Sequence, residues 1–174
     1  MSLESAVETA VREGCARAKA ASRRMALATT AQKNALLARI SGAIRASKPA
    51  LLAANAEDLA AADGKGVAPA LRDRLRLDDG RLEALAKAVD EVAALPDPVG
   101  ETVTETVRPN GLRVRRVRAP LGLIAMVYEA RPNVTVDASV LALKTGTAVV
   151  LRGGSDAIAS NRALAALVRQ ALVD

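Results

Sequence analysis

The fold is decided by residues 121–154, whose sequence is LGLIAMVYEARPNVTVDASVLALKTGTAVVLRGG. Gly122–Tyr128 and Thr147–Arg152 are continuous apolar runs, which are typical of parallel strands covered on both faces. Thr135–Leu143 predicts a helix between them, and Asp156–Leu172 predicts a second helix. Strands joined by a crossover helix predict an α/β fold. Because two strands alone do not make a stable parallel sheet with both faces covered, the sequence predicts a piece of a larger α/β domain.

Upstream of this stretch, residues 1–98 predict helices in series. Helix start and stop signals are the capping box Thr29–Gln32, the proline start Ser47–Pro49, the stop Asp63–Gly66, the short helical turn Pro69–Arg74 and the cap Asp78. On the first helix one face carries Val7, Val11, Cys15, Ala18 and Ser22. We expect that face to be buried, with Cys15 as inert packing.

A β-hairpin is predicted between the helices and the sheet. Two prolines in Leu95–Gly100 stop the last helix. Glu101–Val107 and Leu112–Arg118 then predict two strands around a turn that contains Gly111. Glu on one strand facing Arg on the other favours this register, and the adjacent Arg115-Arg116 predicts a bulge.

Composition excludes several classes of protein. The net charge is +6, but five Arg and two Glu between Glu101 and Arg118 supply +3 of it, and Tyr128 is the single aromatic residue. A basic hairpin without an aromatic platform argues against nucleic-acid binding. One cysteine and no histidine argue against a disulfide framework and a metal site. The polar opening Met1–Glu8 and the short apolar runs predict no signal peptide, no membrane span and a cytoplasmic protein.

The first candidate site is Arg152-Gly153-Gly154-Ser155, which leaves a strand and enters a helix. In open α/β sheets ligands bind beyond the carboxyl ends of strands, near helix N-termini whose free N–H groups favour anions. Arg152 adds a cation, and the glycines let a ligand approach the backbone. The alternative is a tight turn in which Ser155 caps the helix and Arg152 lies on the surface.

The second candidate site is Tyr128-Glu129-Ala130-Arg131-Pro132-Asn133-Val134-Thr135, which also follows a strand and opens a helix. Its charged and amide side chains lie at the same end of the sheet as Arg152. The alternative is that Asn133 or Thr135 simply caps the helix that follows.

The second segment, extended to Asp137, closely resembles the gamma-glutamyl phosphate reductase family of the aldehyde dehydrogenase superfamily. Further matching strings follow in the family's order: Ala54–Asp58, Asp73–Leu75, Asp97–Gly100, Leu143–Gly146 and Leu151–Gly154. The resemblance covers essentially the whole chain as the N-terminal portion of the family. It implies a helical segment, a β-hairpin arm and the start of a parallel Rossmann-like sheet.

The resemblance implies NADPH-dependent reduction of L-glutamyl 5-phosphate to L-glutamate 5-semialdehyde, in proline biosynthesis. In the family a cysteine thiolate displaces phosphate, and hydride then reduces the thioester. That cysteine lies in a catalytic domain absent from this sequence. Cys15 is not its counterpart, so we expect the 174-residue chain alone to be inactive.

Site residues follow from the same resemblance. NADP is expected on Tyr128, Arg152, Gly153, Gly154 and Ser155, and substrate on Glu129, Arg131 and Asn133. Many relatives of the superfamily have Lys at the position of Arg152 and a ribose-binding Glu at that of Ser155. Losing this carboxylate removes repulsion toward a 2′-phosphate, which Arg152 can pair with. Relatives also place an oxyanion-binding Asn where this sequence has Ala130, so Asn133 is the candidate donor.

The expected organisation is therefore a helical part over 1–98, an oligomerisation hairpin over 99–119 and the first βαβα units over 120–174. The resemblance suggests a homo-oligomer through the hairpin and glutamate 5-kinase as a partner. The alternatives are a non-catalytic binding or assembly protein that keeps the fold, or an aldehyde dehydrogenase of another substrate. The string from Tyr128 to Thr135 argues against the last.

Overall fold

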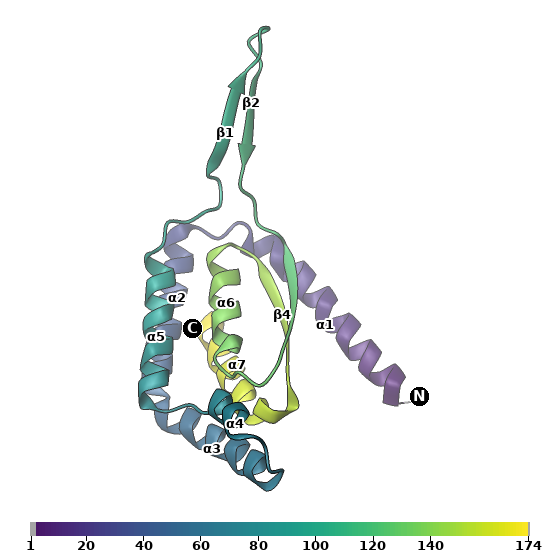
Figure 1. Ribbon diagram of the computed structural model, residues 1–174. Helices are drawn as coiled ribbons and strands as arrows, with labels where there is room; N and C mark the ends of the chain where they lie inside the picture. Colours follow the sequence, from purple (N-terminus) through teal and green to yellow (C-terminus); the bar gives the residue numbers. More distant parts are fainter. Residues whose placement is uncertain (1–2, 174) are drawn as a thin grey trace.

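The computed structural model describes residues 3–173 (Figure 1). The prediction about a signal peptide uses Met1–Glu8, so it falls in part on Met1 and Ser2, which lie outside the described residues. Asp174 lies outside them as well. The elements in chain order are α1 (Leu3–Met25), α2 (Thr30–Ala46), α3 (Lys48–Gly64), α4 (Pro69–Leu75), α5 (Asp79–Ala94), β1 (Thr102–Val107), β2 (Arg113–Val117), β3 (Leu123–Tyr128), α6 (Val134–Lys144), β4 (Ala148–Gly153), the 3-10 turn η1 (Ser155–Ala157) and α7 (Ile158–Val173). Every helix and strand predicted from the sequence is present.

The helix signals act as predicted. Thr29 and Gln32 form a reciprocal capping box at the start of α2, and the Asp78 carboxylate accepts a hydrogen bond from the backbone N–H of Arg81 at 2.8 Å. Pro49 stands in the first turn of α3, where its missing N–H costs nothing. These local signals fix where α2, α3 and α5 begin.

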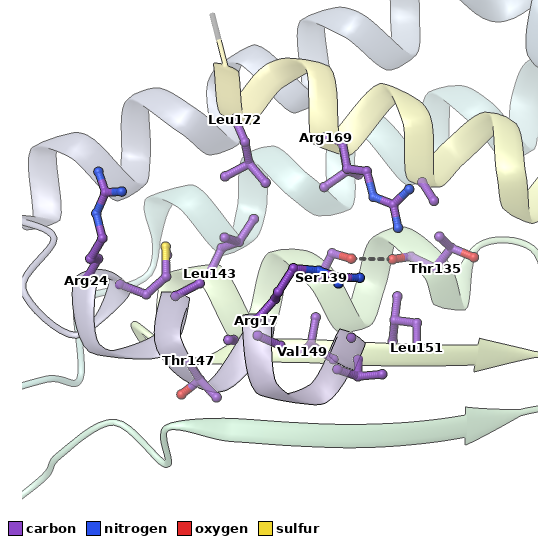
Figure 2. Close-up of a pocket in the computed structure, with 18 of the residues that line it drawn as sticks. Arg17, Arg24, Thr135, Ser139, Leu143, Thr147, Val149, Leu151, Arg169 and Leu172 are labelled. Carbon is purple, nitrogen blue, oxygen red and sulfur yellow. Dashed lines mark hydrogen bonds between the residues drawn. The ribbon is translucent and has the colours of Figure 1, made fainter. Parts of the chain in front are cut away.

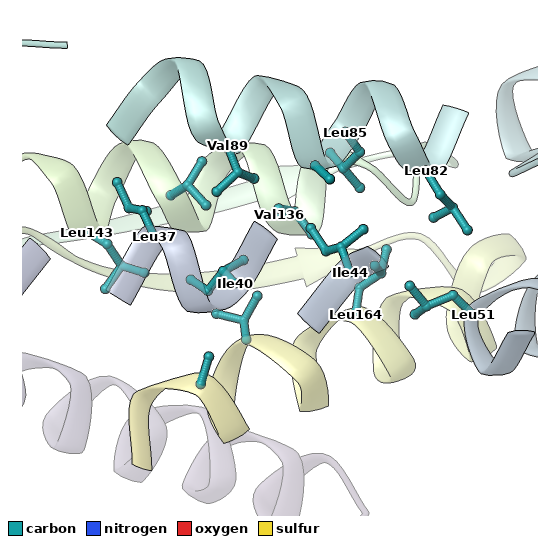
Figure 3. Close-up of a cluster of buried hydrophobic side chains, with 14 of the residues drawn as sticks. Leu37, Ile40, Ile44, Leu51, Leu82, Leu85, Val89, Val136, Leu143 and Leu164 are labelled. Atoms are coloured by element: carbon teal, nitrogen blue, oxygen red, sulfur yellow. The ribbon is translucent and has the colours of Figure 1, made fainter. Parts of the chain in front are cut away.

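The hydrophobic core lies where α2, α5, α6 and α7 meet (Figure 3). Its fully buried members are aliphatic: Leu37, Ile40, Ile44, Leu82, Val89, Val136 and Leu164. Burying a side chain of this size contributes about 1.5–3 kcal/mol, so this cluster is the main source of stability and holds α6 and α7 against the helical segment.

A nearly buried ion pair fixes the base of the hairpin. The Lys33 ammonium on α2 lies 2.8 Å from an Asp97 carboxylate oxygen, and these side chains are 2% and 11% exposed. Asp97 also accepts hydrogen bonds from the Thr30 hydroxyl and the Val99 backbone N–H. Burial works to raise the pKa of Asp97, but these three donors outweigh it and hold the pKa below its ordinary value.

The hairpin projects from the body, and every residue of its two strands is exposed (Figure 1). Glu105 stands opposite Arg115 in the antiparallel ladder and pairs with the guanidinium of Arg113, as the predicted Glu–Arg facing requires. The predicted bulge is present, but its extra residue is Val103 on β1, where the register shifts between Thr102 and Thr104. The bulge therefore lies on the strand facing Arg116 and Val117, not at the predicted Arg115-Arg116.

The predicted burial of the first helix was wrong over its N-terminal half. Val7 and Val11 are each 58% exposed, and Cys15 is half-buried. In Figure 1, α1 leads away from the body, and only its last turns pack beside β4. The face is half-buried at Cys15 and Ala18 and buried at Ser22, but no described element covers Val7 and Val11.

The two strands β3 and β4 pair in parallel, from Leu123 opposite Ala148 to Tyr128 opposite Gly153. The prediction that both strands are covered on both faces was wrong within residues 3–173: Met126 is 41% and Val127 78% exposed. The helices in this range cover β3 and β4 incompletely. The two strands are therefore partly exposed, although their apolar sequences are typical of a buried sheet.

Candidate functional site

The structure brings the two candidate segments together. Because Tyr128 and Gly153 are register partners, the loop after β3 and the turn after β4 leave the sheet at the same edge. A Cβ added to Gly154 would lie 3.5 Å from the carbonyl carbon of Glu129, so the two connections are in van der Waals contact. This carboxyl edge is where ligands bind in open α/β sheets.

Arg152 is exposed at this edge. Its Nη1 donates a hydrogen bond to the carbonyl oxygen of the next residue, Gly153, at 2.8 Å, and no carboxylate pairs with it among residues 3–173. Ser155 is also exposed, and it does not cap the helix: Gly154 occupies the N-cap position of the 3-10 turn, without a side-chain bond. The alternative in which Ser155 is the cap was therefore wrong.

Two of the N-terminal N–H groups of α7 are not free for an anion, contrary to the expectation. The N–H groups of Ala159 and Ser160 donate to the two carboxylate oxygens of Asp58 on α3, at 3.0 and 2.8 Å. Asp58 is 4% exposed, so a protein carboxylate already occupies that helix end. Arg152 is a cation that the edge still offers to an anionic ligand.

In the second segment Glu129 and Arg131 are exposed, while Asn133 is half-buried. Neither suggested cap operates: Asn133 occupies the N-cap position of α6 without a capping bond, and its amide donates to the Asp137 carboxylate at 2.8 Å. Burial raises the pKa of Asp137, and this hydrogen bond opposes the rise. Glu129, Arg131 and Arg152 therefore stand in solvent at one edge, and Asn133 is held beside them.

Beneath the edge lies a buried polar chain that the sequence did not predict. Tyr128 Oη is 2.6 Å from Thr135 Oγ1, and Thr135 Oγ1 donates to Asn161 Oδ1 at 3.0 Å. Asn161 Nδ2 is the one buried side-chain polar atom without a hydrogen-bond partner among the described residues. The sequence held only a weak indication that Asn161 is buried. It lies three residues before the core residue Leu164, on the same face of α7.

A pocket of about 1480 Å³ opens on the other side of this chain, between α1, α6, α7 and β4 (Figure 2). Four arginines and, among the described residues, no carboxylate line it, and Arg17 and Arg169 reach toward it from α1 and α7. β3 contributes only Tyr128, so the pocket follows the side of β4 that no described strand pairs.

Two classes of site have no counterpart among residues 3–173. None of the described helices combines the length and the apolar character needed to cross a bilayer. No group of three His, Cys, Asp or Glu side chains in that range is placed to hold a metal ion.

Comparison with known proteins gives one consistent result. The chain is 57% identical over 166 residues to the gamma-glutamyl phosphate reductase of Kineococcus radiotolerans, covering 95% of this chain and 38% of that protein. It is 53% identical over 156 residues to that of Parvibaculum lavamentivorans, covering 90% and 37%. The chain thus spans less than two fifths of these relatives. No family model matches it.

Solved structures agree. A gamma-glutamyl phosphate reductase from Thermotoga maritima superposes with a TM-score of 0.89 at 42% identity, over 92% of this chain and 39% of that one. A benzaldehyde dehydrogenase from Corynebacterium glutamicum superposes with a TM-score of 0.69 at 18% identity, over 88% of this chain and 31% of that one, which shows a shared fold.

Proposed function

Because this chain belongs to the gamma-glutamyl phosphate reductase family, within the aldehyde dehydrogenase fold, we propose that it is the cofactor-binding portion of an enzyme that reduces L-glutamyl 5-phosphate with NADPH. The products are L-glutamate 5-semialdehyde and phosphate, and the pathway is proline biosynthesis in the cytoplasm. One observation carries the proposal: the two candidate segments meet at one sheet edge. Arg152 is exposed there and pairs with no carboxylate among the described residues.

The residues present fit an NADP cofactor. Arg152 is a solvent-exposed cation, and Ser155 supplies no negative charge beside it. Gly154 lies against the backbone of Glu129, which a Cβ there would meet at 3.5 Å, so the two connections form one surface. Tyr128, Gly153 and Gly154 would form the floor beneath the cofactor, and Arg152 would pair with the 2′-phosphate. When bound, the nicotinamide supplies the hydride.

For the substrate we propose Glu129, Arg131 and Asn133. Arg131 is an exposed guanidinium at the edge and suits a carboxylate or an acyl phosphate. The Asn133 amide donates one hydrogen bond to Asp137. We propose that the same amide donates to the oxyanion that develops on the substrate. The thiolate that attacks the acyl carbon and expels phosphate would come from the part of the relatives that this chain does not span.

Replacing Arg152 by Ala should weaken NADPH binding about tenfold or more, because a charge-assisted hydrogen bond contributes roughly 1.5–3 kcal/mol. NADH lacks the 2′-phosphate and should be affected much less. The measurement is the dissociation constant of each cofactor, with NADPH-dependent semialdehyde formation in parallel, in a reductase of the relatives' full length that carries this chain. The 174-residue chain alone should bind the cofactor without turnover, since its one thiol, Cys15, is half-buried on α1 and belongs to neither candidate segment.

Arg74→Ala is the matched control, because Arg74 is an exposed arginine on α4 that belongs to neither candidate segment. Ser155→Glu is the reciprocal variant, since a carboxylate beside Arg152 should repel the 2′-phosphate and favour NADH. Equal losses of NADPH and NADH in Arg152→Ala would make Arg152 a turn residue and refute its role. Cofactor binding without any turnover by the full-length protein would favour a non-catalytic binding protein.

The hairpin over 99–119 is the proposed oligomerisation arm, with glutamate 5-kinase as a further partner of the assembled enzyme. Both of its edges are unpaired within residues 3–173, and its four strand valines are 44–61% exposed: Val103, Val107, Val114 and Val117. Open strand edges of this kind pair with another chain or need protection. A second subunit would satisfy them.

Replacing both Val103 and Val107 by Lys should shift the full-length enzyme to smaller species, because two charges would enter the paired surface. Light scattering gives the mass. The control is the double variant Ala53→Lys, Ala60→Lys, which adds the same two charges at exposed positions of α3. A hairpin variant whose mass equals that of the control would refute the arm's role.

A further inference from the structure

The turn that carries Arg152 is held by Arg152 itself. Nη1 of this side chain donates to the carbonyl oxygen of Gly153, one residue along, at 2.8 Å. The contact curls the guanidinium back over its own turn. A guanidinium that extends toward a ligand gives this carbonyl up, and the Gly153 oxygen then needs another donor.

A donor without a partner lies directly beneath the same residue. A Cβ built on Gly153 would lie 2.3 Å from Asn161 Nδ2 and 3.0 Å from the Tyr128 hydroxyl, so a side chain there would displace the Asn161 amide. Asn161 is 8% exposed, and Nδ2 has no hydrogen-bond partner among the described residues. A buried amide donor of this kind is rare in folded proteins and calls for an explanation.

In this structure the amide has its Oδ1 toward Thr135 and its Nδ2 toward Gly153. Thr135 has a single hydroxyl proton, which it donates to Asn161 Oδ1 at 3.0 Å. Tyr128 must therefore be the donor in its 2.6 Å bond with Thr135. The chain Tyr128–Thr135–Asn161 runs in one direction and leaves the amide nitrogen of Asn161 toward Gly153.

We propose that Asn161 is a positioning residue for Arg152: its Nδ2 donates to the Gly153 carbonyl when the guanidinium leaves that oxygen to pair with the cofactor phosphate. This inference rests on the proposed role of Arg152. The two glycines make the exchange feasible, because the peptide between Gly153 and Gly154 can rotate without a Cβ clash. The unpartnered amide becomes satisfied only in the bound state, which favours release of the arginine.

The test uses the full-length reductase and the ratio of the NADPH and NADH dissociation constants. Asn161→Leu removes the donor at similar side-chain size and should weaken NADPH about fivefold relative to NADH, as expected for the loss of one net hydrogen bond. In an Arg152→Ala background the same change should leave the ratio unaltered, because the exchange no longer occurs.

Thr135 provides a second, independent variant. Thr135→Val frees the Asn161 amide to turn over and should shift the ratio in the same direction, whereas Thr135→Ser keeps the hydroxyl and should restore the wild-type ratio. Thermal melting reports fold damage, which would lower the affinity for both cofactors alike. If Asn161→Leu does not fold, the Val and Ser variants decide the question.

An unchanged ratio in Asn161→Leu or Thr135→Val, beside a selective NADPH loss in Arg152→Ala, would overturn the inference and leave the proposed function standing. A shift of the same size in the Arg152→Ala background would likewise overturn it. Equal NADPH and NADH losses in Arg152→Ala itself would instead overturn the role of Arg152, and the inference with it.

Discussion

Replacing Asp97 by Ala lowers the free energy of unfolding by about 3–5 kcal/mol, the cost of leaving one partner of a buried ion pair alone. The Lys33 ammonium is 2% exposed and loses both carboxylate oxygens, which lie 2.8 and 3.1 Å away. The Val99 N–H and the Thr30 hydroxyl lose the same acceptor. Chemical denaturation monitored by circular dichroism measures the change.

The control is Asp90→Ala, because Asp90 pairs with Arg45 at 2.8 Å in an exposed bridge and should cost less than about 1 kcal/mol. Adding Lys33→Met to Asp97→Ala removes the unpaired charge and should recover most of the loss. If the double variant is less stable than Asp97→Ala, the unpaired ammonium is not the cause.

The same carboxylate predicts a pH dependence. Since the folded-state pKa of Asp97 is held below its ordinary value of 3.8, its contribution is fully present above that pH. The contribution is lost as the pH falls through the lowered folded-state pKa. The stability difference between the wild type and Asp97→Ala should therefore be constant near neutrality and narrow below about pH 4. Unfolding curves from pH 7 to pH 2 measure it.

Replacing Asp58 by Ala should cost about 2–4 kcal/mol, because it removes a helix cap and leaves two N–H groups of α7 without an acceptor in a buried place. Both carboxylate oxygens are used, on Ala159 and Ser160, a hundred residues along the chain. The negative charge also lies at the positive end of the α7 dipole. Thermal and denaturant unfolding measure the loss.

Glu57→Ala is the matched control, since Glu57 is the exposed neighbour of Asp58 on α3 and should change stability by less than about 0.5 kcal/mol. Asp58→Asn keeps one acceptor oxygen and should fall between the two. A loss in Asp58→Ala no larger than that of Glu57→Ala would show that solvent replaces the cap.

Of the candidate site, the sequence predicted the two segments and their meeting at one sheet edge, because the carboxyl ends of parallel strands share that edge. It did not predict what holds the segments. Asp58 on α3 accepts hydrogen bonds from the start of α7, and Asn161 on α7 accepts one from Thr135 and lies against Gly153. Such contacts join residues that are far apart in the chain, so they produce no periodic pattern in the sequence.

The sequence by itself determined the order of the elements, the capped starts at Thr29 and Asp78, and the family. These features depend on residues within a few positions of one another, whose backbone preferences act wherever the chain lies. Only the tertiary structure decided which apolar faces are covered: Val7 and Val127 are exposed although their patterns predict burial. Periodicity reports that a face is apolar, whereas burial requires a second element against it, and for these two faces residues 3–173 supply none.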